Sequence, residues 1–426
     1  MELIEDKDDN KNKSFNFDKI ILNKGIIQII EKTLKENEDL LIATELTWTL
    51  LNMVNFPSKH CKYEYFLHFF TDDYINIYKK LIPFHKGDIT ENIFTFLANL
   101  CIENKECRHL LIKNNILSIS FSAFKSSSNN YDEFLAGLHF FSNITLNVSE
   151  LQREGKTLLL NLFDSLIREG VECDLLITAI KGVFNILVYD EESEIKQSID
   201  YISAKGTIEK IMAIDIFKIQ TEHIESLHVM IYFIFNLISV IIERKESEKD
   251  LYDFIVKYDI FTHFDIIFHS TKMTNIYRPI LQTVMRIVMR LNETITKAFM
   301  THSFFITVQN LLLNYAFEIR KITAEIILNC LMINNFDITS VIYNTNIIDI
   351  IINSLLLNES DSLMIQISLE CILYYLKSGS MFGAENPFLK DCLNKGIEDV
   401  LLKSENLTDE NMKLVEEINK IISNYK

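Results

Sequence analysis

Apolar residues recur at helical spacing from residue 17 almost to the end of the chain. Segments such as residues 26–34 and 347–356 place apolar side chains three and four positions apart, which is the pattern of helices that bury one face or more. Only 10 glycines and 4 prolines interrupt 426 residues. Because strand-rich folds need more turn residues than this, the pattern predicts long helices joined by short connectors.

One five-residue pattern returns eight times along these helices. Its copies are WTLLN at 48–52, TFLAN at 95–99, HFFSN at 139–143, KGVFN at 181–185, YFIFN at 232–236, QTVMR at 282–286, EIILN at 325–329 and ECILY at 370–374. Successive copies lie 42 to 51 residues apart, close to the period of armadillo and HEAT repeats. The pattern therefore indicates an array of repeats.

Each repeat also contains two further apolar helices ahead of the helix with the pattern. Three helices per repeat is the armadillo plan, whereas HEAT repeats have two. We therefore predict an all-α fold, a right-handed armadillo-repeat superhelix (an α-solenoid) of about eight repeats. A HEAT-type array is the alternative, which the helix count per repeat would settle.

The predicted array has distinct ends and two longer connectors. Residues 1–16 are polar and form an expected disordered acidic tail. The repeats occupy residues 17–406, and residues 407–426 are expected to form a last pair of short helices that caps the stack. Charged residues at 189–203 and 243–250 are expected to be solvated connectors.

Six of the eight copies end in an asparagine: Asn52, Asn99, Asn143, Asn185, Asn236 and Asn329. An amide side chain offers two hydrogen-bond donors and an acceptor, so a row of amides on successive helices suits the backbone of an extended peptide. The alternative is that these inner-helix amides bond between repeats and only fix the stack.

The formal net charge of −17 argues against a nucleic-acid surface and against binding to anionic membranes. It suits a basic partner, although acidity can also serve solubility alone. The longest apolar run, residues 229–242, includes Asn236 and is shorter than a membrane span. Residues 1–13 are too polar for a signal peptide.

Seven scattered cysteines indicate buried free thiols in a reducing compartment. Cys101, Cys107 and His109 could be proposed as metal ligands, but no fourth ligand accompanies them and their spacing fits no common zinc signature. Nucleotide-binding, hydrolase and metalloprotease motifs are absent from the sequence. We therefore expect no metal, no cofactor and no enzyme activity.

Three segments resemble importin-alpha, the armadillo adaptor of nuclear import: residues 43–52, 93–113 and 382–400. The resemblance extends in order over nearly the whole chain. It implies a concave groove that binds the lysine-rich localisation peptides of cargo proteins, and a protein found in cytoplasm and nucleus. In that family, asparagines hold the peptide backbone, and tryptophans one turn earlier pack on the alkyl stems of lysines.

Carried over to this chain, the main site comprises the first three copies of the pattern. Trp48 and Asn52 match the family fully, one turn apart on one helix face. Asn99 and Asn143 keep the amide, His139 stands in a tryptophan position, and Glu103 matches an acidic residue that meets a lysine. The site prediction also includes the later ladder residues Asn185, Asn236 and Asn329.

Other positions depart from the family. Thr95, Gln282 and Glu325 replace tryptophans, and Arg286 replaces an asparagine in a groove for basic peptides. The resemblance implies importin-beta as a further partner, yet residues 1–16 lack the basic arm that binds it. A second hypothesis is therefore an armadillo scaffold that binds another protein through its groove without nuclear-import activity.

Overall fold

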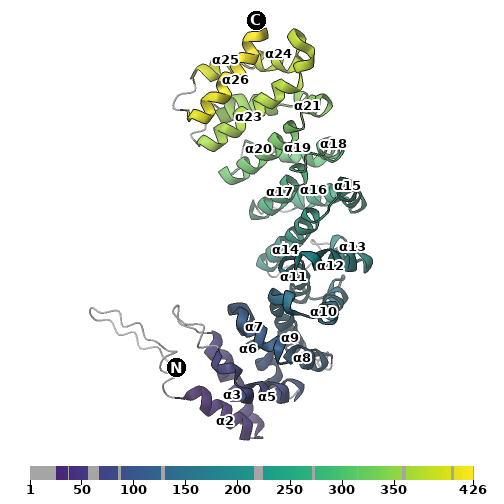
Figure 1. Ribbon diagram of the computed structural model, residues 1–426, viewed down its shortest axis with the longest axis vertical. Coiled ribbons are helices and arrows are strands. Elements are labelled where there is room, and N and C mark those ends of the chain that lie inside the picture. The colour runs from purple at the N-terminus through teal and green to yellow at the C-terminus, as the bar shows by residue number, and fades with distance from the viewer. Residues whose placement is uncertain are drawn as a thin grey trace, which may run out of the picture. The chain divides into compact units, whose positions relative to one another are not determined.

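The structure is a computed structural model that describes residues 25–36, 38–55, 67–84, 88–125, 130–214, 224–270, 274–313, 315–356, 361–403 and 407–425. All regular elements within these ranges are helical, as the sequence predicts. The chain divides into two compact units, Met1–Thr207 and Ile208–Lys426. The fold is an all-α solenoid, in which successive helices pack on their neighbours within each unit (Figure 1).

The N-terminal unit contains ten described α-helices. They are α2 (Ile26–Glu36), α3 (Leu40–Asn55), α5 (Asp72–Leu81), α6 (Ile89–Glu103), α7 (Lys105–Lys113), α8 (Ile116–Phe124), α9 (Tyr131–Ile144), α10 (Arg153–Leu166), α11 (Cys173–Tyr189) and α12 (Glu192–Ala204). Three 3₁₀ segments join them: η1 (His68–Phe70), η2 (Ile82–Phe84) and η3 (Thr145–Glu150).

The C-terminal unit continues the same plan. Its helices are α13 (Thr207–Met212), α14 (Ile224–Glu243), α15 (Glu248–Lys257), α16 (Ile260–Ser270), α17 (Thr274–Val288), α18 (Glu293–Thr301), α19 (Ser303–Asn310), α20 (Phe317–Met332), α21 (Phe336–Tyr343), α22 (Ile347–Ile350), α23 (Ser362–Ser378), α24 (Pro387–Asn394), α25 (Ile397–Lys403) and α26 (Asp409–Tyr425). A π-helical segment, η4 (Ile351–Leu356), extends α22, and the 3₁₀ segment η5 (Ser380–Glu385) follows α23.

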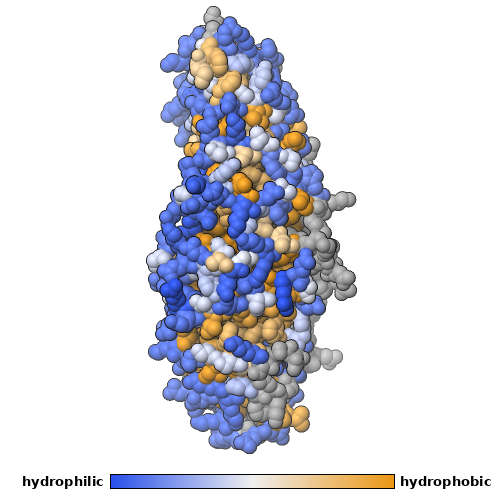
Figure 2. All heavy atoms as spheres, turned by 90° about the vertical axis from the view of Figure 1, so that its right-hand side faces the viewer, coloured by the Kyte–Doolittle hydropathy of each residue, from blue (hydrophilic) through white to orange (hydrophobic). Residues whose placement is uncertain are grey.

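Eight helices carry the recurring pattern, and we call them the ladder helices; within each unit they pack against one another in order. They are α3, α6, α9 and α11 in the N-terminal unit, and α14, α17, α20 and α23 in the C-terminal unit. In the C-terminal unit, α15, α18 and α21 line the side away from the ladder helices (Figure 1). Seen from that side, the surface is mainly hydrophilic, with scattered apolar side chains (Figure 2).

The number of helices between ladder helices distinguishes the two repeat types. In the C-terminal unit, two helices separate each ladder helix from the next, for example α15 and α16 between α14 and α17. This three-helix repeat is the armadillo plan. Between α9 and α11, however, only the 3₁₀ segment η3 and the single helix α10 remain.

Apolar burial accounts for the long hydrophobic run at 229–242. In α14 an 18-residue window, Ser226–Glu243, is long and apolar enough by composition to cross a membrane, which exceeds the length predicted from sequence. Within the unit, 56% of that window is buried, and the helix packs along α17. Removal of this apolar surface from water stabilises the stack.

Two expectations from the sequence are wrong, one about a connector and one about the C-terminal cap. Most of the predicted connector at 189–203 is the helix α12, which buries Ile195, Ile199 and Ile202. Asp190, just before this helix, is not solvated either, because it is buried and pairs with Lys156 of α10, with Nζ–Oδ1 2.7 Å apart. The expected pair of short helices at 407–426 is one helix, α26, which packs along α23. Within the C-terminal unit, α26 therefore continues the row of ladder helices after α23.

Asparagines begin many of the helices. In the described chain, five of them accept hydrogen bonds from backbone N–H groups of the first helical turn: Asn104, Asn130, Asn292, Asn335 and Asn386. Such N-caps satisfy donors that the helix itself cannot. At these five positions, asparagine thus serves local structure.

Candidate functional site

The candidate site is the surface of the ladder helices, where the predicted residues lie. We call the last residue of each pattern its ladder position and the residue four earlier its preceding-turn position. These two positions share a helix face. Trp48 and Asn52 occupy them on α3, and the Trp48 side chain is 56% exposed. Asn52 Nδ2 donates to the Trp48 carbonyl at 2.9 Å, so its Oδ1 keeps no partner among the described residues.

The next ladder helix, α6, carries Asn99 and Glu103. Asn99 is half-buried at the ladder position, and Thr95 is half-buried at the preceding-turn position. Glu103 is the last residue of α6, but its side chain lies outside the described residues. Its predicted contact with a lysine stays a prediction.

Asn143 and Asn185 hold the stack together. Asn143 is buried and its Nδ2 donates to the carbonyl of Ala98 on α6 at 3.1 Å. Asn185 is buried as well and donates to the carbonyl of Ser142 on α9 at 3.0 Å. In each case the acceptor precedes the ladder residue of the previous helix. For Asn143 and Asn185, the structure thus shows the alternative in which inner-helix amides form hydrogen bonds between repeats. Both side chains are buried, so a bound peptide cannot reach their N–H groups.

A lysine lies next to this bonded pair. Lys181, at the preceding-turn position of α11, donates through Nζ to Asn143 Oδ1 at 3.0 Å. Burial lowers the pKa of Lys181. His139, at the preceding-turn position of α9, lies at the surface, but burial of part of its ring and the charge of Lys181 lower its pKa. The third and fourth ladder helices therefore present a cation and a neutral imidazole.

The ladder positions of the C-terminal unit differ again. Asn236 and Asn329 are half-buried and donate to carbonyls of their own helices, Tyr232 at 2.7 Å and Glu325 at 2.8 Å. Arg286 is tied to the end of α14, with Nε 2.9 Å from Glu243 Oε1 and Nη1 bonded to Ser239. Its positive charge is thus partly neutralised by Glu243.

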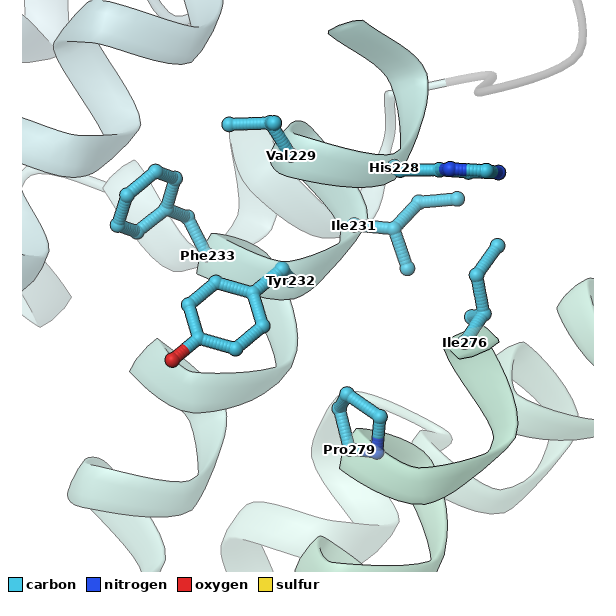
Figure 3. A pocket seen from close by; sticks show the side chains of 7 residues that line it. All are labelled: His228, Val229, Ile231, Tyr232, Phe233, Ile276 and Pro279. Carbon is cyan, nitrogen blue, oxygen red and sulfur yellow. The ribbon is translucent and has the colours of Figure 1, made fainter. Parts of the chain in front are cut away.

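A pocket of about 400 Å³ opens between α14 and α17, beside the fifth ladder position. Its lining is almost wholly apolar: Val229, Ile231, Tyr232, Phe233, Ile276 and Pro279. Figure 3 shows the side chains of Ile231 on α14 and Ile276 on α17 pointing toward each other, with His228 at one end and Tyr232 and Pro279 at the other. We call it the Tyr232 pocket.

The sequence prediction missed Tyr232. It occupies the preceding-turn position of α14, one turn before Asn236, and is 51% exposed. An aromatic residue at a position where the resembled family has tryptophan was a signal that could have identified it. Tyr232 and Trp48 are the tyrosine and the tryptophan at preceding-turn positions in the described ladder helices, and both are exposed.

The three residues considered as metal ligands have other roles. Cys101 and Cys107 are buried; burial raises the pKa of the Cys101 thiol well above its usual range and that of Cys107 to about 12. His109 Nδ1 lies 2.6 Å from Glu150 Oε2. Within the described residues, no group of three or more histidine, cysteine or carboxylate side chains is arranged to hold a metal ion.

Comparison with known proteins supports the fold. No family model matches the chain, and no curated protein matches its sequence. Among solved structures, an engineered protein matches with a TM-score of 0.64 and 12% identity, over 93% of this chain and 98% of its own. A chain from a structure of the phosphorylation-controlled interaction between cadherin and beta-catenin matches with a TM-score of 0.61 and 8% identity, over 97% of this chain and 78% of its own.

These identities are low enough that the likeness shows the fold alone. The chain has the armadillo-type helical-repeat fold. The specific resemblance to importin-alpha stays a prediction, because neither comparison distinguishes that family from other helical-repeat proteins.

Proposed function

We propose that this protein is an armadillo scaffold that binds an extended segment of another protein along its ladder helices. The observation that carries the proposal is the exposure of Trp48, the single tryptophan of the chain, on a ladder helix. Large aromatic side chains on these helices are otherwise mostly in the core, as Phe96 and Phe140 are. An exposed tryptophan is a typical centre of a protein interface.

Asn52 adds a hydrogen-bonding group beside that ring. Its Oδ1 can accept a backbone N–H from a bound segment, while Nδ2 stays bonded to the helix. A backbone hydrogen bond contributes about 1 kcal/mol, and a lysine–aromatic contact about 0.5–2 kcal/mol. Micromolar binding therefore needs several such contacts along the segment.

Nuclear import is the more specific candidate, with lysine-rich localisation peptides of cargo proteins as the partners and cytoplasm and nucleus as the locations. The Trp48–Asn52 pair and the net charge of −17 favour it. The charge of Lys181 and the bonded amides of Asn143 and Asn185 weigh against it, because they leave the third and fourth helices poorly suited to a basic peptide. The general scaffold function is therefore our conclusion.

The test uses Trp48 fluorescence. A lysine-rich localisation peptide is titrated into the full-length protein at two salt concentrations, beside random twelve-residue peptides selected by display. Import predicts a saturable change with the lysine-rich peptide that Asn52→Ala abolishes and that Asn310→Ala, at an exposed asparagine of α19 outside the ladder helices, leaves intact. A scaffold of other specificity predicts selected peptides that perturb Trp48 while the lysine-rich peptide does not.

Either result depends on an accessible ring. If iodide and acrylamide do not quench Trp48 in the free protein, or if no selected peptide depends on Trp48 and Asn52, the proposed surface is wrong.

A further inference from the structure

The Tyr232 pocket has the chemistry of an anchor site for an apolar side chain. Its walls come from two ladder helices of one unit, α14 and α17, and Val229 and Tyr232 at its edge are 44% and 51% exposed. Transfer of such surface out of water contributes roughly 25 cal/mol per Å². A volume of about 400 Å³ is sufficient for a large aliphatic or aromatic side chain.

The residue before Pro279 of the pocket lining is an arginine that has no partner among the described residues. Arg278 stands between Tyr277, whose ring stacks on Phe268 with centroids 3.8 Å apart, and Pro279, which lines the pocket. The backbone at Arg278 is therefore held in place. Its side chain is exposed, and it forms no ion pair or hydrogen bond with the described residues.

The two arginines that follow Arg278 along the chain are already engaged: Arg286 lies on α17 and Arg290 lies just beyond its end. Arg286 pairs with Glu243, and Arg290 Nη2 donates to backbone carbonyls at the end of α14, the shortest bond being 2.7 Å to Glu243. Arg278 is thus the guanidinium available for a carboxylate, which it can meet with two parallel hydrogen bonds.

The neighbouring polar groups favour the same partner. Among the described side chains of α14 and α17, the single carboxylate is Glu243, at the far end of α14 and paired with Arg286. Of the described ionisable residues, His228 lines one end of the pocket, and Arg278 precedes Pro279, which also lines it. Asn236, one turn from Tyr232, retains an Oδ1 without a partner in the described structure, which can accept a backbone N–H.

From these observations we infer that the Tyr232 pocket binds an extended partner segment whose large apolar side chain enters the pocket while an adjacent aspartate or glutamate pairs with Arg278. This inference rests on the proposed function and names the segment that the C-terminal ladder helices accept. A lysine-rich segment would instead place its charges against Arg278.

The test selects peptides against four full-length proteins: wild type, Tyr232→Ala, Arg278→Glu and the control Arg168→Glu. Arg168 is also exposed but lies in the connector between α10 and α11. A displayed library of random twelve-residue peptides is the probe. Wild type and Arg168→Glu should both enrich an apolar residue next to an aspartate or glutamate, whereas Arg278→Glu should enrich lysine or arginine at that place.

Individual peptides from the wild-type selection should bind Tyr232→Ala at least about tenfold more weakly, and Tyr232→Phe nearly as well as wild type. An unchanged preference in Arg278→Glu, binding indifferent to Tyr232→Ala, or no enrichment on wild type would each overturn the inference. Arg168→Glu, which lies outside the ladder helices, should bind these peptides as tightly as wild type. Loss of the Trp48 response alone would contradict the N-terminal site and not this one, because the readout here is the dependence of binding on Tyr232 and Arg278.

Discussion

Lys181 donates a hydrogen bond through Nζ to Oδ1 of Asn143, 3.0 Å away on the preceding ladder helix. The same asparagine donates its N–H to the carbonyl of Ala98 on the helix before that. One amide thus connects three consecutive ladder helices. Both of its functional groups are used inside the protein, so the ladder is in part a structural device.

Asn185→Ala should therefore lower stability. The variant loses a buried hydrogen bond to the Ser142 carbonyl, which we expect to reduce the free energy of unfolding by about 1–2 kcal/mol. Asn329→Ala loses only a bond within its own helix and should change it by less than about 0.5 kcal/mol. Urea unfolding followed by circular dichroism measures both. Equal effects would mean that the inter-helix bond does not matter.

Removal of the Lys181 charge should strengthen the binding of lysine-rich peptides. Lys181→Met abolishes the cation that faces a basic segment and frees Asn143 Oδ1. If lysine-rich peptides bind the N-terminal ladder helices, their affinity should rise severalfold, and the gain should shrink at high salt because screening weakens the repulsion. Fluorescence titration through Trp48 provides the affinity. A weaker complex in Lys181→Met would show that the lysine contacts the peptide favourably.

The pH dependence of His139 follows from its lowered pKa. Burial and the Lys181 charge disfavour the protonated ring in the folded state, so the unfolded chain binds this proton more readily. The contribution of neutral His139 to the free energy of unfolding is fully present above the pKa of the unfolded chain, about 6.5. It is lost as the pH falls from that pKa toward the lower pKa of the folded protein.

Proton NMR of the imidazole, assigned with His139→Gln, should show titration below pH 6.5. The Lys181→Met variant should raise that midpoint, because the second cause of the shift is removed. An unshifted midpoint in wild type would contradict the structure around this ring.

A close approach between α10 and α11 gives a packing test. At Gly182 a Cβ would lie 2.4 Å from Cζ of the buried Phe163 ring. Gly182→Ala should therefore cost about 1–3 kcal/mol of stability through overpacking. Gly155 on α10 has its nearest contact at 4.0 Å, so Gly155→Ala should be neutral or stabilise by up to about 1 kcal/mol. Thermal unfolding of both variants measures these effects. Equal melting temperatures for Gly182→Ala and Gly155→Ala would contradict the close approach at Gly182.

The sequence was sufficient to predict the architecture, because the spacing of the recurring pattern is set by the length of one repeat. Eight patterns at a spacing of 42 to 51 residues locate eight helices that do pack in order within their units. The helix count between α14 and α17 then favours armadillo over HEAT. Pattern alone could not show that Asp190 is buried, because its partner Lys156 lies 34 residues away in the sequence.

The candidate site was less accessible to prediction. The sequence does not distinguish an asparagine that donates a hydrogen bond within its own helix, as Asn236 does, from one that donates to the neighbouring helix, as Asn185 does. Burial decides between these cases, and burial depends on how closely two helices approach. The pocket beside Tyr232 likewise arises from side chains of two helices about 45 residues apart, and no local motif announces it.

The asparagine caps described above have a consequence for acid tolerance. A carboxylate cap loses much of its hydrogen-bonding strength when it is protonated, whereas an amide has no proton to gain in the accessible pH range. The helix starts at Asn104, Asn130, Asn292, Asn335 and Asn386 should thus remain formed in acid. The start of α23, which Asp361 caps, should be among the first to fray.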